Sequence, residues 1–435
     1  MASPARERFA WFLEVLRTGR FTESELASGF TESFLEQVSP ATLWSMSRQL
    51  APEIGDTGPE VSDDGEHRLS ARLEQFDAVA WVEAQAPYRF NELIFRPRVD
   101  PIADPRLTGA QWSAVGDSGV AVDLLRRASA DGAVVGVVAA GFDGRSAEPV
   151  WGVAGGFADV DAGTAMELER RMFVGSITKL LTAVSVLRLV AAGAIGLKDS
   201  ANDHLEAVRI GSDEVTVERL LAHTAGVCSN FAHYVSRVPS LPELLGREVG
   251  VEFRPGSRHA YSNGGYAMLG EIIATVRGLP YHEAVKADVL EPLAMHNSEI
   301  LLSWPADAPR GYQGRGGKLF ASPELVPSVP AAGGLYATVG DLARLVNGWR
   351  ALLPGELSTA ALDSHVEITS TLAQGYGWAI ANANGRRIAG HGGGTLGSCS
   401  SLWWDPEQGV ASFVLLNLES GPAETINLEL LERAF

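Results

Sequence analysis

A serine and a lysine three residues apart, Ser176 and Lys179, stand at the start of a run of small and apolar residues. Of the four lysines in the chain, Lys179 alone has a serine at this spacing. Residues three apart share one face of a helix, so the hydroxyl and the amine can meet. A serine hydroxyl needs a base to become a nucleophile, and a lysine whose pKa is lowered by burial can serve. The pair predicts an acylated serine, although a capping serine beside a surface lysine has the same pattern.

Two further motifs follow, and each occurs once. Tyr261 and Asn263 form the single Tyr-x-Asn of the sequence, and His391 begins its single His-x-Gly, which continues through Gly393 and Gly394. A phenol above the nucleophile can relay a proton between serine, lysine and leaving group, and the amide of Asn263 can contact the substrate. Glycines on a strand edge let a substrate backbone approach closely and expose an N–H to an oxyanion.

A tetrahedral intermediate needs two donors for its oxyanion. A nucleophile at a helix N-terminus contributes its own N–H, so Ser176 is expected to supply one donor and Gly394 the other. His391 is expected to bind or orient the substrate or to assist proton transfer, beside Gly393 as a further substrate contact. Each motif alone also fits a surface turn or a glycine-rich hairpin, but the three together in this order predict acyl-enzyme chemistry.

The elements that must position these residues form a domain from about residue 115 to 435. Its strongest helix is predicted over 176–192, where small and apolar residues run almost without a break, so this helix should be buried. Strands are predicted over residues 133–141, 150–157 and 388–418. Further helices are predicted over residues 216–223, 264–277, 341–352 and 424–434. Strands from both ends of the domain around an inserted helical cluster predict an α/β sandwich with an antiparallel sheet.

Residues 1 to about 110 are expected to form a separate small α+β unit. Helices are predicted over 4–16 and 40–49, a Gly/Pro/Asp-rich loop over 55–65, and strands over 68–76, 78–85 and 88–96. Helices followed by an antiparallel meander resemble the cone-shaped domains of nuclear transport factor 2 and ketosteroid isomerase. A linker is expected at 101–105.

Composition is typical of a globular enzyme of two domains. The 435 residues are 46% hydrophobic and 20% charged, and 53 acidic against 35 basic residues give a net charge of −18, which argues against nucleic acid as a partner. No apolar run approaches the length of a membrane span, and no secretory segment is recognised, so a cytoplasmic location is expected. Cys228 and Cys399 lack the spacing of a zinc site, so neither a metal nor a disulfide is expected, and no cofactor is implied.

Together the motifs resemble those of the serine β-lactamase and penicillin-binding-protein superfamily. Within it, they are most similar to the branch that holds class C β-lactamases, D-stereospecific peptidases and β-lactamase-like (family VIII) carboxylesterases. Similar segments continue at residues 220–226, 253–256, 291–295 and 332–338. The resemblance implies a fold of the β-lactamase/transpeptidase type, with Ser176 acylated, Lys179 and Tyr261 transferring protons, and Asn263 contacting the substrate. His391 stands where β-lactam-cleaving members have a lysine that holds the substrate carboxylate.

An imidazole is mostly neutral at pH 7, so the site is expected to favour esters, amides or acyl donors without that carboxylate. The fused N-terminal unit resembles the arrangement in the β-lactamase-like protein of clavulanic acid gene clusters, which implies bacterial secondary metabolism. This chain differs in having Ser262 inside its second motif. The expected partner is a small-molecule acyl substrate, and the small unit is expected to pack against the catalytic cleft or to form a homodimer.

Several functions stay open at this point. The leading hypothesis is a serine hydrolase for esters or amides. An acyltransferase would share the first half-reaction and pass the acyl group to an amine or alcohol. A β-lactamase or D-Ala peptidase, and a sensor that binds β-lactams or peptidoglycan fragments without turnover, are the remaining alternatives.

Overall fold

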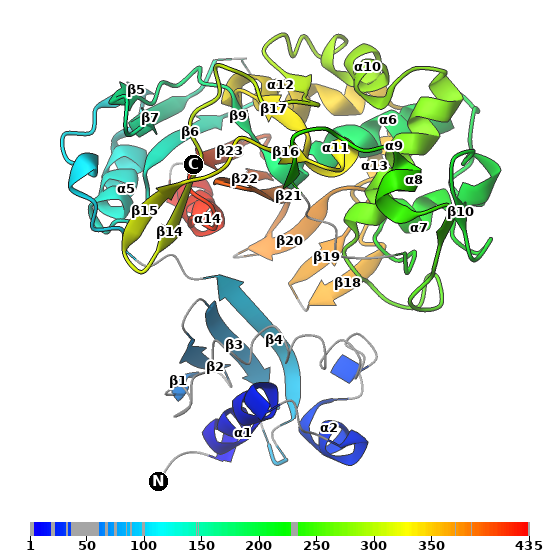
Figure 1. Cartoon of the computed structure of the whole chain (residues 1–435), viewed down its shortest axis with the longest axis horizontal. Helices are drawn as coiled ribbons and strands as arrows, with labels where there is room; N and C mark the ends of the chain where they lie inside the picture. The colour runs from blue at the N-terminus through cyan, green and yellow to red at the C-terminus, as the bar shows by residue number, and fades with distance from the viewer. Residues whose placement is uncertain are drawn as a thin grey trace. The chain divides into compact units, whose positions relative to one another are not determined.

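The computed structural model describes residues 4–18, 22–31, 34–35, 61–65, 68–73, 76–83, 85–87, 89–97, 101–144, 146, 148–227, 234–369, 371–383 and 385–433. The chain divides into two compact units, Met1–Val99 and Asp100–Phe435 (Figure 1). In the part of the chain that the structure describes, no helix combines the length and apolar character that a membrane crossing requires.

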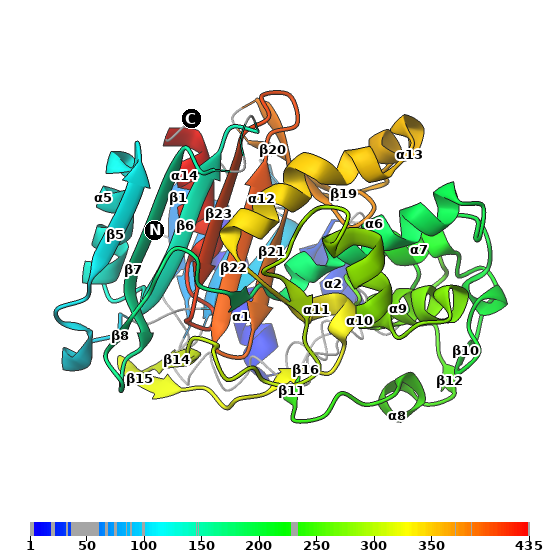
Figure 2. The ribbon, with the colours of Figure 1, turned by 90° about the horizontal axis from the view of Figure 1, so that it is seen from above.

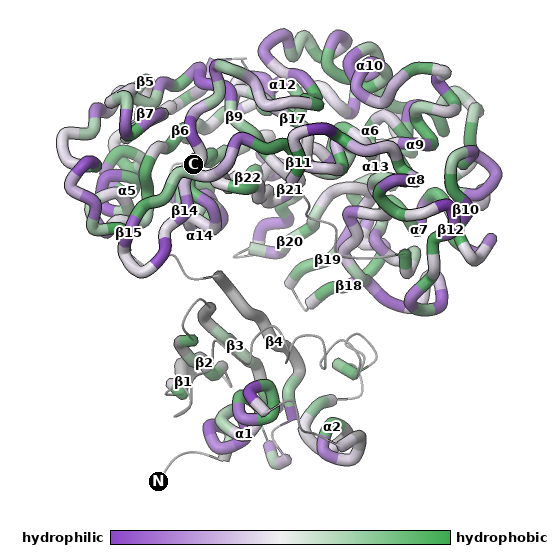
Figure 3. Tube along the Cα trace, viewed as in Figure 1, coloured by the Kyte–Doolittle hydropathy of each residue, from purple (hydrophilic) through white to green (hydrophobic). Residues whose placement is uncertain are grey.

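The small unit contains two helices and one antiparallel sheet whose strands follow chain order. Its elements are α1 (Pro4–Thr18), α2 (Glu23–Gly29), β1 (Val61–Gly65), β2 (Arg68–Arg72), β3 (Phe76–Val82) and β4 (Phe90–Pro97). Green and purple residues lie side by side along α1 in Figure 3, because one face of this helix is apolar and buried. Aromatic rings fill the core, with the centroids of Phe12 and Phe30 5.2 Å apart and those of Phe30 and Phe90 also 5.2 Å apart.

The predicted meander is present, and two elements of the small unit differ from the prediction. β1 lies in the segment expected as a loop, because backbone pairing of Val61 with Ala71 forms this strand where the sequence shows no apolar alternation. The short helix α2 begins at a capping box formed by Thr22 and Glu25. The helix predicted over 40–49 lies outside the described residues.

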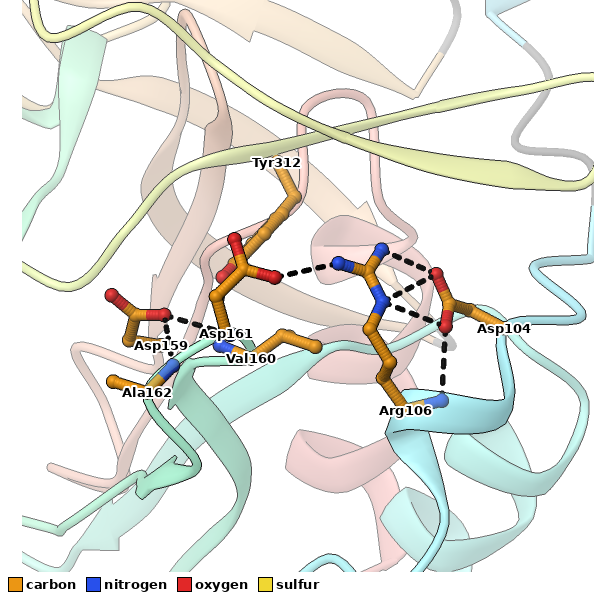
Figure 4. A network of polar contacts seen from close by, with 7 residues as sticks. All are labelled: Asp104, Arg106, Asp159, Val160, Asp161, Ala162 and Tyr312. Atoms are coloured by element: carbon orange, nitrogen blue, oxygen red, sulfur yellow. Dashed lines mark hydrogen bonds and ion pairs between the residues drawn. The ribbon is translucent and has the colours of Figure 1, made fainter.

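The start of the large unit is anchored, although residues 101–105 were expected to form a linker. The backbone N–H of Ile102 donates to Gly132 O at 3.0 Å. Arg106 then lies between two carboxylates, with Nη2 2.6 Å from Asp104 Oδ2 and Nη1 2.6 Å from Asp161 Oδ1 (Figure 4). The next residue back along the Asp161 turn, Val160, donates its N–H to the Tyr312 hydroxyl. The contact between Arg106 and Asp161 ties the first segment of the unit to the turn that follows the strand at residues 151–159.

The centre of the large unit is a ten-stranded sheet in which every pair is antiparallel. In spatial order its strands are β18 (Val366–Thr369), β19 (Leu372–Gln374), β20 (Ala379–Ala383), β21 (Arg386–Thr395), β22 (Ser398–Trp404), β23 (Ala411–Leu416), β6 (Gly136–Phe142), β7 (Trp151–Asp159) and β5 (Trp112–Gly116), with β8 (Thr164–Ala165) paired to β7. β6 lies beside β23, so the two ends of the domain meet in the middle of the sheet. The predicted α/β sandwich with an antiparallel sheet is confirmed.

Helices cover this sheet on two sides (Figure 2). α5 (Gly119–Ala130) and α14 (Ala423–Arg433) pack together against apolar residues of β6, β7 and β23. The remaining helices gather with the main hydrophobic core: α6 (Thr178–Ala191), α7 (Val217–Leu221), α8 (Leu241–Leu245), α9 (Asn263–Arg277), α10 (Tyr281–Val285), α11 (Pro330–Gly333), α12 (Val339–Gly348) and α13 (Gly355–Ala360). α6 is buried along most of its length, as predicted, and α9 and α11 pack against it.

Short strands complete the unit. They pair as β9 (Met172–Phe173), β17 (Leu335–Ala337) and β13 (Glu299–Ile300) in one sheet, and as β10 (Arg209–Ile210) with β12 (Glu248–Val249), β11 (Tyr234–Val235) with β16 (Val326–Pro327), and β14 (Tyr312–Arg315) with β15 (Lys318–Ala321). One boundary differs in a way that concerns the chemistry. The helix predicted from residue 176 begins at Thr178, and Ser176 lies in a preceding 3₁₀ turn, Gly175–Ile177.

Candidate active site

The turn that carries Ser176 is held from both sides. The hydroxyl of Thr178 donates to Gly175 O at 2.6 Å, and this closes the turn at the start of α6. From the sheet, the hydroxyl of Ser400 on β22 donates to Val174 O at 2.9 Å. Gly175 has a φ of +51°, in the left-handed region that glycine adopts without strain. Ser176 is left half-buried, with its hydroxyl beside the buried end of Lys179.

Lys179 is completely enclosed, and its amine has three partners among the residues that the structure describes. Nζ lies 3.0 Å from Ser176 Oγ, 2.8 Å from Asn263 Oδ1 and 2.9 Å from the carbonyl oxygen of Ala332. Burial lowers the pKa of Lys179 well below its ordinary value, because the ammonium form loses its hydration. These partners come from the 3₁₀ turn before α6, from α9 and from α11.

The three partners match the donors and acceptor of a neutral amine. The carbonyl of Ala332 and the amide oxygen of Asn263 can only accept, so they take the two N–H donors of a neutral amine. Its lone pair is then left for Ser176, the one partner that can donate. This arrangement allows Lys179 to accept the hydroxyl proton when Ser176 attacks an acyl group.

Tyr261 lies beside this pair. Its ring centroid is 4.7 Å from Lys179 Nζ. Tyr261 as a whole is 37% exposed, but the protein around its phenol group excludes enough water to raise the pKa of the phenol above its ordinary value, and nearby Ser176 offsets part of this rise. The phenol is therefore protonated at neutral pH and can give a proton to a group that leaves from the serine.

His391, on β21, is buried and neutral. Its ring centroid lies 6.1 Å from that of Tyr261, and Nδ1 donates to the carbonyl oxygen of Gly392. Burial, which removes water from the charged form of the imidazole, is the main cause that lowers the pKa of His391 to about 4. At pH 7 the imidazole carries no charge, and the Nδ1–H donor leaves Nε2 as an acceptor.

β21 has a free edge beside the nucleophile. β20 pairs only with residues 386–390 of β21, so residues 391–395 pair, among the described strands, with β22 alone. A side chain at Gly393 would place its Cβ 2.0 Å from Val174 O, so the close approach of the two segments requires glycine. A Cβ at Gly394 would meet nothing within 4 Å, so an extended substrate can approach the strand there.

The same strand also meets the nucleophile turn. The position of a Cβ on Gly175 would be 2.7 Å from the backbone N of Gly394. The backbone of β21 therefore lies against the residue that precedes Ser176. The structure thus brings together all the residues that the three motifs singled out.

Two contributors to the site were missed by the sequence analysis. Ala332 acts through its backbone carbonyl, which no side-chain motif reports. His223 is buried, its Nδ1 accepts from the N–H of Ser262 at 3.0 Å, and its ring centroid is 4.4 Å from that of Tyr261. Both residues lie in segments that carry the family resemblance, and this was the only signal available. Of the two cysteines, Cys228 lies outside the described residues. Cys399 is buried, and its thiol donates a hydrogen bond to the carbonyl oxygen of Gly421.

Known proteins share this architecture. The chain is 29% identical over 290 residues to penicillin-binding protein 4 of Amycolatopsis lactamdurans, which covers 59% of this chain and 74% of that protein. It is 24% identical to the D-aminopeptidase of Brucella anthropi, over 66% of this chain and 57% of the relative. The structure of the octameric penicillin-binding protein homologue from Pyrococcus abyssi superposes with a TM-score of 0.63 at 26% identity, covering 72% of this chain and 76% of that one.

A protein family also matches, over most of the large unit. Residues 121–434 match the Beta-lactamase family, and the residues that meet at Ser176 all lie within this range. The chain therefore belongs to the Beta-lactamase family, whose members share the serine hydrolase fold of β-lactamases and penicillin-binding proteins.

Proposed function

We propose that the protein is a serine hydrolase that cleaves esters or amides through an acyl-enzyme on Ser176. The observation that carries this proposal is the buried amine of Lys179, whose partners leave its lone pair for the serine hydroxyl. A surface lysine would be charged at pH 7 and would have no proton-accepting capacity.

The reaction proceeds in two halves. Oγ of Ser176 attacks the acyl carbon while its proton moves to Nζ of Lys179. The oxyanion accepts from the backbone N–H groups of Ser176 and Gly394. The bond to the leaving group breaks, and the proton passes from Lys179 through the Tyr261 phenol to the departing oxygen or nitrogen. Water then attacks the acyl-enzyme, and the released Ser176 oxygen regains a proton.

The neutral His391 limits the class of substrate. A carboxylate beside the scissile bond would meet an uncharged imidazole there, and its desolvation would lack the compensation of an ion pair. Esters and amides without that carboxylate are therefore preferred over β-lactams. Two relatives support amide cleavage by their names: the D-aminopeptidase of Brucella anthropi, and a D-stereospecific amidohydrolase from Streptomyces sp. that is 25% identical with a TM-score of 0.59.

The test is turnover of p-nitrophenyl butyrate, with intact-protein mass followed over time. Wild type is expected to show a transient butyryl adduct, and Ser176→Ala neither adduct nor turnover. Ser185→Ala is the matched control, because Ser185 lies buried on the same helix and has no role in the site. Equal acylation of wild type and Ser176→Ala would overturn the proposal.

An added amine separates hydrolysis from acyl transfer in the same experiment. If water is the acceptor, the butyryl adduct clears at a rate that the amine does not change. Faster clearing with formation of the butyryl amide would instead assign acyl transfer. A cytoplasmic location, a homodimer, a role in secondary metabolism and the steroid-isomerase-like character of the small unit stay predictions from the sequence.

A further inference from the structure

His223 adopts a backbone conformation that is uncommon for a residue with a side chain. Its φ is +57°, and the residue is 1% exposed, directly after the end of α7. A non-glycine residue in the left-handed region persists only where its surroundings hold it there. The chain before it is anchored, because the carbonyl of Leu221, two residues earlier, accepts from the Tyr266 hydroxyl at 3.1 Å and from the Gly377 N–H.

From this position His223 holds the chain on both sides of Tyr261. Its backbone carbonyl accepts from the N–H of Ala260 at 2.8 Å, and its Nδ1 accepts from the N–H of Ser262 at 3.0 Å. Residues 259–262 belong to no helix or strand, so no ladder of backbone hydrogen bonds orients this tyrosine. The two hydrogen bonds to His223 take the place of such a ladder.

The imidazole ring also packs against the phenol. The ring centroids of His223 and Tyr261 are 4.4 Å apart, and those of His223 and Tyr266 are 5.0 Å apart. Tyr261 is thus fixed at its backbone and against one face of its ring, beside the amine of Lys179. A tyrosine that relays protons between Ser176, Lys179 and a leaving group must keep its hydroxyl within hydrogen-bond distance of them.

The hydrogen bond from Ser262 also fixes the tautomer of His223. An Nδ1 that accepts carries no hydrogen, so the neutral ring holds its hydrogen on Nε2, which has no partner among the described residues. A buried donor without a partner and a left-handed backbone both cost stability. Two such costs in one residue at the active site indicate a function.

We propose that His223 is a positioning residue, which holds Tyr261 in place for proton transfer during acylation of Ser176. This inference rests on the proposed function and adds to it a residue that touches neither Ser176 nor the substrate. It acts through Tyr261, so its contribution should vanish when the phenol hydroxyl is absent.

A double-mutant cycle tests this. The acylation rate is measured by stopped flow with p-nitrophenyl butyrate for wild type, His223→Phe, Tyr261→Phe and the double variant. His223→Phe keeps an aromatic ring and removes the Nδ1 acceptor, and we expect acylation to slow about tenfold or more, since coupled neighbours interact by energies of this order. In the Tyr261→Phe background the same substitution should change the rate less than about twofold.

Two further variants keep the test decisive. His223→Asn tolerates the left-handed backbone and offers an amide oxygen to the Ser262 N–H, so it should restore part of the rate lost in His223→Phe. His365→Phe is the control, a histidine stacked on Tyr376 that makes none of the site contacts, and it should acylate like wild type. If His223→Phe is unstable, the cycle is run with His223→Ala, which also lacks the acceptor for the Ser262 N–H.

The outcomes separate this inference from the proposed function. If wild type is not acylated on Ser176, the proposed function fails. If wild type is acylated and His223→Phe is acylated as fast, or slows by the same factor with and without the Tyr261 hydroxyl, positioning by His223 is overturned while the acyl-enzyme stands.

Discussion

Lys179 would be a cation in water, yet the structure encloses its side chain completely and surrounds its amine with three oxygen atoms. Two of these oxygens cannot donate, so a neutral amine directs its two hydrogens to them and its lone pair to Ser176, and this is the form that can accept a proton. Burial also keeps the His391 imidazole uncharged, and the Tyr261 phenol, whose pKa is raised, stays protonated at neutral pH. At the residue scale, the reactivity of Ser176 depends on the neutral amine of Lys179, which can accept the hydroxyl proton.

Replacing Lys179 tests this base directly. Lys179→Met should slow acylation by about 10²–10⁴-fold, the usual contribution of a general base. Lys179→Arg should be equally slow, because a guanidinium keeps its proton and cannot accept another. Acylation is measured by stopped flow with p-nitrophenyl butyrate, and Lys198→Met, which changes an exposed lysine, is the control. Acylation by Lys179→Arg at a rate near that of wild type would contradict the assignment.

His391 is predicted to set the charge of the acceptable substrate. His391→Lys places a cation at this position and should raise kcat/KM for an ester that bears a carboxylate, relative to its neutral methyl ester, by about tenfold or more, since a hydrogen bond to a charged group is worth about 1.5–3 kcal/mol. His391→Gln, which adds no charge, should leave this ratio unchanged. An equal ratio in wild type and His391→Lys would remove the basis for the substrate class.

At the element scale, the site depends on how closely β21 approaches the turn before α6. Gly393→Ala would bring a methyl group against Val174 O, so we expect a loss of about 1–3 kcal/mol in the free energy of unfolding and slower acylation. Gly394→Ala adds the same methyl group in open space and should stay within about 0.5 kcal/mol of wild type. Urea denaturation compares the two, and equal stabilities would mean that the segments are not in close contact.

The sequence predicts those elements whose side chains carry the signal. The apolar run of α6 and the strands β6 and β7 predict the α/β sandwich. The order of the three motifs predicts the nucleophile, Ser176. The 3₁₀ turn at Ser176 was missed, because its glycine-dependent conformation follows from contact with β21. β1 was also missed, because only its pairing with β2 makes its polar residues a strand.

Some parts of the site leave no pattern to read. Any residue at position 332 could offer the carbonyl that binds Lys179, so its identity says nothing about this role. The helix predicted over residues 216–223 includes His223 and gives no sign of its left-handed backbone or of its bond to Ser262, because both arise from tertiary contacts. Side chains that react are recognisable in a sequence, whereas backbone groups that hold them are not.

At the scale of the whole molecule, buried neutral histidines make stability depend on pH. The pKa values of His259 and His391 are lowered to about 4, mainly by burial, from an ordinary value of 6.5. Between these values the unfolded chain binds protons that the folded chain does not, so the free energy of unfolding should fall as the pH falls from about 6.5 to 4. Each such histidine contributes at most about 1.4 kcal/mol per pH unit.

Denaturation by urea at several pH values measures this slope. His259→Phe removes one of these protons, and the fall in the free energy of unfolding between pH 6.5 and 4.5 should be smaller in this variant than in wild type. The same slope in both proteins would show that His259 is not held neutral in the fold.

The central claim is that Ser176 is the residue that becomes acylated, and one measurement tests it most directly. Wild type is treated with a fluorophosphonate at pH 7, digested with trypsin and analysed by tandem mass spectrometry. Cleavage after Arg171 and Lys179 releases residues 172–179, in which Ser176 and Thr178 are the only hydroxyl side chains. We predict that the adduct is on Ser176 of this peptide. An adduct on Thr178 or on another peptide, with residues 172–179 unmodified, would contradict the account.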